Sequence, residues 1–169
     1  MLFIRSSAQS RLVETRCDTL SDHESAPKAA WYDLIDPTPE ERAFVDRAAQ
    51  VSIPSREEIE EIEVSSRLYN ENGVEYMTVT AAARLDTDDP IKSPVMFALS
   101  GTALVTVRYN ELKPFSNVIE RAARPGACAT CNGEHIMLTL IEAMVDRLAD
   151  TLERVVADVD QMSRNVFRA

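Results

Sequence analysis

The sequence lacks several features that would place it in a large class of proteins. Its 169 residues include no apolar run of about 18 residues, the length that a membrane-spanning helix needs. The apolar segment at the start of MLFIRSSAQSR is too short for a secretory signal. Three cysteines, an odd number, fit a reducing compartment better than a disulfide framework. We therefore expect this chain to be soluble and cytoplasmic.

Histidine is also scarce, and no catalytic motif accompanies it. The two histidines are His23, in a polar segment, and His135. The sequence contains no glycine-rich phosphate loop and no nucleophile elbow. Nothing in it pairs a serine or cysteine with a base, which nucleophilic catalysis requires. We expect that the chain is not an enzyme.

Negative charge is what the sequence has in excess. Asp and Glu number 28 against 18 Lys and Arg, which gives a formal net charge of −10. An acidic surface repels phosphate backbones, which argues against a nucleic-acid partner, and it attracts cations, divalent ones most strongly. The alternative is that the charge only keeps the protein soluble.

Short extended segments alternate with capped helices along the chain. Strands are predicted at 2–4, 11–15, 31–35, 65–70, 74–85, 94–99 and 103–109. Helices are predicted from Thr38 to Ala49, from Ser55 to Glu63 and from Pro114 to Ala123, the first two opened by capping boxes. Tight hairpin turns at Gly73 and Gly101 favour a mixed sheet over a purely parallel one. The pattern predicts an α/β or α+β fold.

A long helix is predicted from Glu134 to Phe167. Its apolar residues recur in steps of three and four and form one seam: Val145, Leu148, Leu152, Val155, Val159, Met162 and Val166. At about 1.5 Å per residue, this helix would be about 50 Å long and would project beyond its own domain. No stop signal precedes the end of the chain at Ala169, so we expect the helix to continue in a longer protein.

Three groups of residues could bind a metal ion. The segment Glu57–Glu63 (EEIEEIE) places five glutamates around Ile59 and Ile62, and Glu142, Asp146 and Asp150 recur every four residues on the long helix. Hard oxygen donors of this kind suit Mg²⁺ or Ca²⁺. In both cases the alternative is a solvated helix face. A third group, Cys128, Cys131 and His135, could supply three zinc ligands, although a structural zinc site needs four.

Four stretches, in this order, resemble the CorA-type magnesium transporters and their zinc-transporting relatives. They are WYDLIDPT at 31–38, IPSREEIEEIE at 53–63 leading into SSRLY at 65–69, LVTVRY at 104–109, and LIEAMVDRLAD at 140–150 with its continuation to Phe167. The resemblance implies an α/β/α sandwich with a mixed β-sheet, followed by a long C-terminal stalk helix. It places the cytoplasmic α/β domain at residues 1–127 and the start of the stalk helix at 128–169. Further helices and two membrane spans would follow beyond Ala169.

The resemblance also implies a function, partners and site residues. It implies a regulatory domain of a homopentameric divalent cation transporter at the cytoplasmic face of the inner membrane. The ion is Mg²⁺, with Zn²⁺ or another divalent cation as the alternative, and acidic sites between neighbouring domains sense it. The family's acidic residues match Glu57, Glu58, Glu142 and Asp146, although the family pattern has Asp where this chain has Glu58. A soluble acidic interaction module that oligomerises through its long helix is the alternative from another class.

Overall fold

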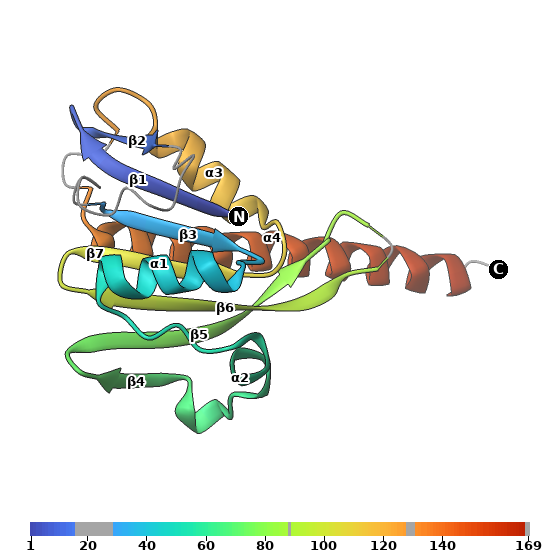
Figure 1. The fold of residues 1–169 in the computed structure, drawn as a ribbon. Helices are drawn as coiled ribbons and strands as arrows, with labels where there is room; N and C mark the ends of the chain where they lie inside the picture. Colours follow the sequence, from blue (N-terminus) through green and yellow to red (C-terminus); the bar gives the residue numbers. More distant parts are fainter. Residues whose placement is uncertain (16–28, 88, 128–130, 168–169) are drawn as a thin grey trace.

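The computed structural model describes residues 1–15, 29–87, 89–127 and 131–167, and its centre is one seven-stranded sheet. The strands lie in the order β2-β1-β3-β7-β6-β5-β4 (Figure 1). Their bounds are β1 Leu2–Ala8, β2 Arg11–Thr15, β3 Trp31–Ile35, β4 Leu68–Glu71, β5 Val74–Ala83, β6 Ile91–Ser100 and β7 Ala103–Arg108. Each contains or overlaps a predicted strand.

The sheet is mixed, as predicted, because one of its pairings is parallel. β3 runs parallel to β7, whereas the other neighbouring strands are antiparallel. The hairpins predicted at Gly73 and Gly101 are confirmed, and both glycines have positive φ, +81° and +57°. Glycine adopts this backbone region without the steric cost that a Cβ would add.

Two helices begin at the predicted capping boxes. Helix α1 spans Pro39–Ala49 with Thr38 as N-cap, and α2 spans Arg56–Glu61 with Ser55 as N-cap. The prediction that α2 continues to Glu63 is wrong, since Ile62 already has extended backbone (ψ 123°) and a 3₁₀ turn follows at Val64–Ser66. Repulsion among clustered glutamates disfavours a longer helix here, and only Ile59 anchors it in the core.

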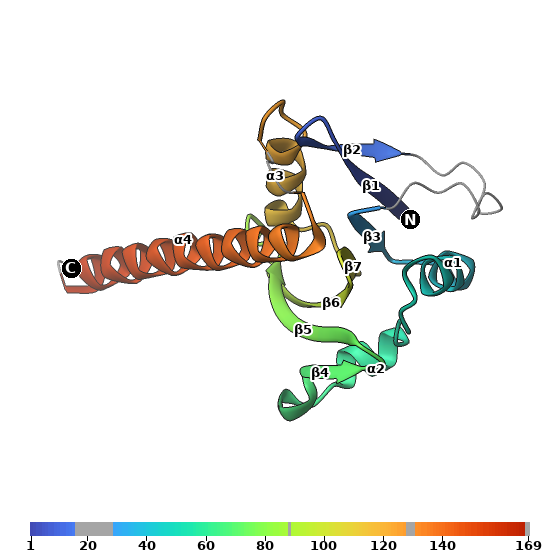
Figure 2. The same ribbon diagram turned by 90° about the vertical axis from the view of Figure 1, so that its left-hand side faces the viewer.

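Helices cover both faces of the sheet, so the fold is the expected three-layer α/β/α sandwich. On one face, α1 and α2 bury Phe44, Val45 and Ile59 against β-sheet residues such as Met96 and Val105. On the other, α3 (Lys113–Ala122) and the first turns of α4 (Gly133–Phe167) bury Phe115, Ile136 and Leu140. Figure 2 shows α1 and α2 on the side of the sheet opposite α3 and α4. Neighbouring residues of β6 alternate between the two cores, as strand geometry requires.

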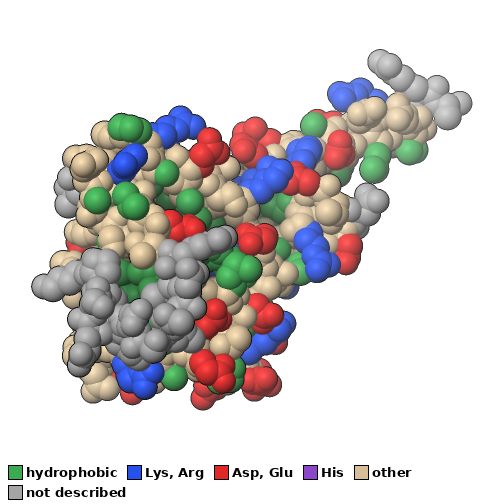
Figure 3. All heavy atoms as spheres, turned by 45° about the horizontal axis from the view of Figure 1, so that its top comes forward, with side chains coloured by type: hydrophobic (Ala, Val, Ile, Leu, Met, Phe, Trp, Pro, Cys, Tyr) green, Lys and Arg blue, Asp and Glu red, His purple; other side chains and the backbone are tan. Residues whose placement is uncertain are grey.

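The long C-terminal helix projects beyond the sandwich, as predicted (Figure 1). All seven residues of the predicted seam, from Val145 to Val166, are more than half exposed, from 51% at Leu148 and Val155 to 71% at Val166. Figure 3 shows hydrophobic side chains at the projecting end of the molecule. An apolar stripe of this length is typical of a helix that packs against a partner.

Ion pairs connect the turn between β5 and β6 to the middle of α4. Asp86 on this turn lies 2.6 Å from Nζ of Lys113, 2.7 Å from Nη2 of Arg147 and 3.8 Å from Nη1 of Arg154. Hydrogen bonds from Lys113 and Arg147, together with their positive charges, lower the pKa of Asp86 to about 2. The two arginines belong to α4, so the carboxylate joins this helix to α3 and the sheet.

We expect Asp86→Asn to destabilise the fold at neutral pH but not in acid. A carboxylate whose pKa is lowered by folding stabilises the native state above its unfolded pKa, about 3.8 here, and loses this effect as the pH falls to about 2. The difference in urea midpoint between wild type and variant should therefore shrink between about pH 4 and pH 2. Asp89→Asn on the same turn is the control, because Asp89 is 84% exposed and lies 4.0 Å from Arg84. A difference for Asp86→Asn that stays constant over this pH range would contradict the prediction.

Candidate metal-binding surface

The α2 glutamates lie on an exposed surface. Glu58 Oε2 accepts a hydrogen bond from the backbone N–H of Ser55 (2.7 Å), and this bond lowers the pKa of Glu58. Glu60 pairs with Arg56 at 2.7 Å. Glu57 has no cationic partner within 4.0 Å among the described residues. This short helix therefore presents carboxylates to solvent, and one oxygen of Glu58 is already used by the helix cap.

The predicted acidic ridge of α4 (Glu142, Asp146 and Asp150) is exposed too, and basic side chains from α3 and from α4 itself border it. Asp146 and Asp150 line a cavity of about 420 Å³ between α3 and α4, together with Lys113, Arg121 and Arg124 of the α3 region and Arg147 of α4. None of these bases lies within 4.0 Å of either carboxylate. From the sequence we expect the arginines of α4 to lie on other faces. Arg147 and Arg154 do pair with Asp86, but Arg147 also lines the cavity of Asp146 and Asp150.

Glu142, the first residue of the ridge, lies beside a separate hollow. This cavity has a volume of about 320 Å³, and Arg121 and His135 are among its lining residues. Positive charge from α3 therefore borders the whole ridge, which weakens its attraction for a cation within a single chain. The sequence does not reveal this arrangement, because it depends on how α3 packs on α4.

The structure does not bring the four predicted metal ligands together. Glu57 and Glu58 belong to the helix anchored by Ile59 in one core, whereas Glu142 and Asp146 belong to the helix anchored by Leu140 in the other. The sheet lies between them (Figure 2). Within the described ranges, no group of three or more His, Cys, Asp or Glu side chains is placed to hold a metal ion. A site that uses both pairs would need more than one copy of the chain.

The suggested zinc ligands, Cys128, Cys131 and His135, do not form a zinc site among the described residues. Cys131 is buried and disulfide-bonded in this structure, which corrects the expectation of reduced thiols at this residue. A sulfur held in a disulfide is not a thiolate, so it cannot serve as a zinc ligand. Cys128 lies outside the described residues, and His135 is exposed on the first turn of α4.

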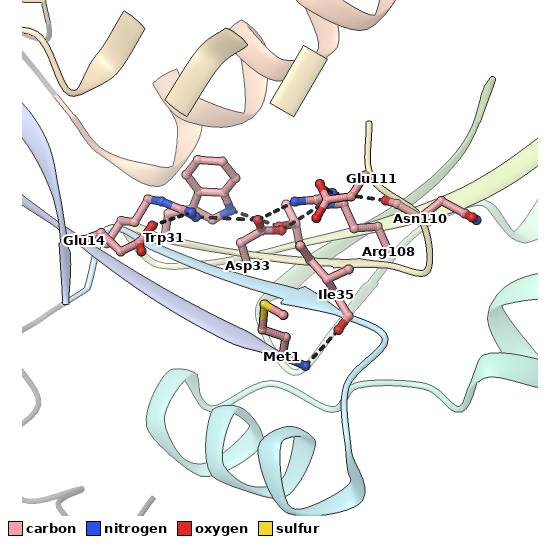
Figure 4. A network of polar contacts seen from close by, with 10 residues as sticks. Met1, Glu14, Trp31, Asp33, Ile35, Arg108, Asn110 and Glu111 are labelled. Carbon is pink, nitrogen blue, oxygen red and sulfur yellow. Dashed lines mark hydrogen bonds and ion pairs between the residues drawn. The ribbon is translucent and has the colours of Figure 1, made fainter. Parts of the chain in front are cut away.

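A buried ionic network lies in the sheet, and sequence reasoning did not predict it. Asp33 on β3 is fully buried and accepts hydrogen bonds from Nη2 (2.9 Å) and Nε (3.2 Å) of Arg108 on β7 (Figure 4). Arg5 on β1 lies 3.5 Å from the same carboxylate, and Thr106 donates a further hydrogen bond to it (2.9 Å). The Asp33 carboxylate is thus occupied by partners from two neighbouring strands, so its role is to fix their pairing.

Comparison with known proteins identifies relatives. Residues 27–169 match the family model described as CorA-like Mg²⁺ transporter protein. The chain is 32% identical over 147 residues to the magnesium transport protein CorA of Haemophilus influenzae strain Rd, which covers 86% of this chain and 46% of the relative. It spans about half the length of the curated relatives it matches. Among the residues described, no helix combines the length and apolar character needed to cross a bilayer.

Two solved structures share the fold. The soluble domain of CorA from Methanocaldococcus jannaschii matches with a TM-score of 0.72 at 12% identity, over 100% of this chain and 65% of that one. The ZntB cytoplasmic domain from Vibrio parahaemolyticus matches with a TM-score of 0.61 at 11% identity, over 92% of this chain and 63% of that one. The family resemblance expected from the sequence is therefore confirmed. Since the family model matches most of its length, the chain belongs to the CorA-like Mg²⁺ transporter family.

Proposed function

We propose that this chain forms the cytoplasmic regulatory domain of a CorA-like divalent cation transporter. In this proposal it contributes acidic residues to ion sensing and to oligomer assembly at the inner membrane, and it has no enzymatic activity. The family match over residues 27–169 carries the proposal, and the shared fold of the CorA soluble domain supports it. Transport itself belongs to the longer protein, whose membrane segments lie outside this chain.

Mg²⁺ is the ion that the proposal favours. The relatives are named as magnesium transport proteins, and the predicted ligands are carboxylates. Hard oxygen donors suit Mg²⁺, which commonly keeps several waters and takes one or two carboxylates from the protein. Zn²⁺ is the alternative that the ZntB-like fold supports. Zinc sites usually contain histidine or cysteine, and the proposed ligand set contains neither.

The proposed ion sites lie between neighbouring copies of the chain. Glu57 and Glu58 lie on one face of the sandwich, and Glu142 and Asp146 lie on the other. One copy can therefore present its α2 carboxylates to the α4 carboxylates of the next. A divalent ion bound there would offset the repulsion of two acidic surfaces and favour the assembled state. The homopentamer implied by the family resemblance is the expected assembly.

We expect Mg²⁺ to raise the thermal unfolding temperature of the wild type and to raise it much less in the double variant Glu57→Gln/Glu58→Gln. An ion that binds only the native state stabilises it by an amount that grows with the logarithm of its concentration divided by its Kd. Loss of two coordinating carboxylates raises the Kd for Mg²⁺ and so removes most of the shift. Glutamine still completes a capping box, so this change removes charge while keeping the start of α2. Differential scanning calorimetry with and without Mg²⁺ measures the shift.

The matched control is Glu61→Gln/Glu63→Gln, which removes the same charge from exposed residues of the same acidic segment. This control should keep most of the Mg²⁺ shift. If the two double variants lost the Mg²⁺ shift equally, the stabilisation by Mg²⁺ would depend only on the total charge of the acidic segment. That result would reject Glu57 and Glu58 as ligands.

A further inference from the structure

A polar cavity lies between α2 and the sheet, on the face opposite α4. It has a volume of about 620 Å³, within the usual range for a small-molecule site. Its lining residues come from α2 and the residues that follow it and from β5 and β6: Ile59, Glu60, Ile62, Arg67, Thr78, Thr80, Lys92 and Pro94. None of the predicted metal ligands lines it.

Arg67 has an unused donor in this cavity. The backbone N–H of Thr78 donates to the carbonyl of Arg67 (2.8 Å), which fixes Arg67 beside β5. The Nε of Arg67 is buried and has no hydrogen-bond partner among the residues that the structure describes. Buried donors are almost always paired in folded proteins, so an unpaired donor on a side chain that lines this cavity supports an acceptor bound beside Arg67.

A second cation and two hydroxyl groups lie on the same side of the sheet. Thr80 pairs with Pro94 and Ala82 with Lys92 in the β5–β6 ladder. Strand alternation puts Thr78, Thr80 and Lys92 on the face that carries Tyr76 and Met96, which belong to the core beneath α1 and α2. Within the described part of the chain, neither Arg67 nor Lys92 has an acidic partner within 4.0 Å.

The acidic lining residue does not cancel this charge. Glu60 Oε1 already accepts a hydrogen bond from Arg56 Nε at 2.7 Å, an ion pair on the rim of the cavity. Two unpaired cations therefore face a polar cavity in a protein whose net charge is −10.

We propose that this cavity binds a small phosphate monoester with an apolar body. The phosphate group accepts hydrogen bonds from Arg67, Lys92 and the hydroxyls of Thr78 and Thr80, and the apolar body lies against Ile59, Ile62 and Pro94. This site is separate from the proposed ion-sensing residues and does not rest on the proposed function.

Charge and donor number select phosphate over carboxylate. A phosphate monoester carries close to two negative charges at neutral pH and three terminal oxygens. It therefore matches two cations and two hydroxyl donors, whereas a carboxylate has one charge and two oxygens. Arginine binds phosphate through a planar fork of N–H donors, and lysine binds it as a point charge.

The test uses the 169-residue chain and three probes: AMP, adenosine and inorganic phosphate. Two-dimensional ¹H–¹⁵N NMR reports binding through the amides of Arg67, Thr78, Thr80 and Lys92. AMP should shift these amides in a saturable way, inorganic phosphate should shift them at higher concentration, and adenosine should not shift them. Arg67→Ala and Lys92→Ala should each raise the Kd for AMP about tenfold or more, since each removes a charge-assisted contact.

Arg124→Ala is the matched control, because Arg124 is 68% exposed and pairs with Glu120 on a different surface. It should leave the Kd for AMP unchanged, and circular dichroism should show that all three variants fold. An equal loss of AMP binding in Arg124→Ala would mean that AMP is attracted by the general positive charge of the protein and not by Arg67 and Lys92. That outcome, or AMP shifts at amides away from the cavity, would overturn the proposal, as would saturable binding of adenosine.

Discussion

Asp33→Ala should lower the free energy of unfolding by about 3–5 kcal/mol, a large share of the stability of an ordinary domain. Asp33 is fully buried, and Arg108 and Arg5 beside it are 2% and 3% exposed. Removal of the carboxylate takes away the buried counter-charge that the two guanidinium groups share. Arg5 then keeps only Glu14 (2.8 Å) and Arg108 only Glu111 (3.2 Å), both more exposed carboxylates. It also deprives Thr106 of its acceptor, which lies 2.9 Å away. Breaking a buried ion pair from one side is costly because the remaining charge stays desolvated.

Equilibrium unfolding in urea, followed through the fluorescence of Trp31, measures this loss. Trp31 is a suitable probe because its indole N–H donates to Thr106 within the same network (2.9 Å). Asp33→Asn keeps the shape and removes the charge, so it should also be strongly destabilising. Asp158→Asn, on an exposed part of α4, removes the same charge and should change the free energy by less than about 0.5 kcal/mol. If Asp33→Asn were as stable as wild type, the ionic network would not be the source of the stability.

Gly133→Ala is expected to have the second largest effect, a loss of about 3 kcal/mol. A Cβ at Gly133 would lie 2.6 Å from the backbone N of Leu104 and 2.7 Å from the carbonyl C of Ala103. These are main-chain atoms of β7, which cannot move aside as a flexible side chain can. The N–H of Gly133 also donates to the carbonyl of Thr102 (2.7 Å), so the clash would separate the start of α4 from the sheet.

The direction of the stability change in Gly133→Ala distinguishes a steric clash from the ordinary effect of helix propensity. In an exposed helix, Gly→Ala usually stabilises by up to about 1 kcal/mol, because alanine has the higher helix propensity. Thermal unfolding should instead show a clearly lower midpoint for Gly133→Ala. Glu134→Ala, at the next and exposed residue, should leave the midpoint almost unchanged. A midpoint for Gly133→Ala at or above that of the wild type would contradict the close approach of α4 to β7.

Local sequence signals predicted the fold well where the structure depends on neighbouring residues. The capping boxes at Thr38 and Ser55, the positive-φ turn at Gly73 and the apolar periodicity of α4 each lie within a few residues of the chain. Contacts between residues far apart in the sequence could not be predicted in this way. Asp33 reads as an ordinary strand residue until Arg108, 75 residues later, is placed beside it. Such contacts follow from the order of strands in the sheet, which local patterns do not determine.

The candidate site was predicted only in part for the same reason. The exposed acidic faces of α2 and α4 follow from their sequences, and both are exposed in the structure. Their separation by the sheet, and the cations of α3 that border Asp146, depend on tertiary packing. The shortness of α2 was also missed, because capping and apolar spacing predict where a helix begins better than where it ends.

Sedimentation velocity of the wild-type chain in Mg²⁺, compared with Na⁺ at equal ionic strength, tests the central claim most directly. Divalent ions that bridge acidic faces of neighbouring copies should shift the chain to a larger species, and EDTA should reverse the shift. Glu57→Gln/Glu58→Gln should assemble much less in Mg²⁺. Assembly that is the same in Na⁺, Mg²⁺ and EDTA would contradict the claim. It would instead indicate an interaction module that associates through the exposed apolar seam of α4.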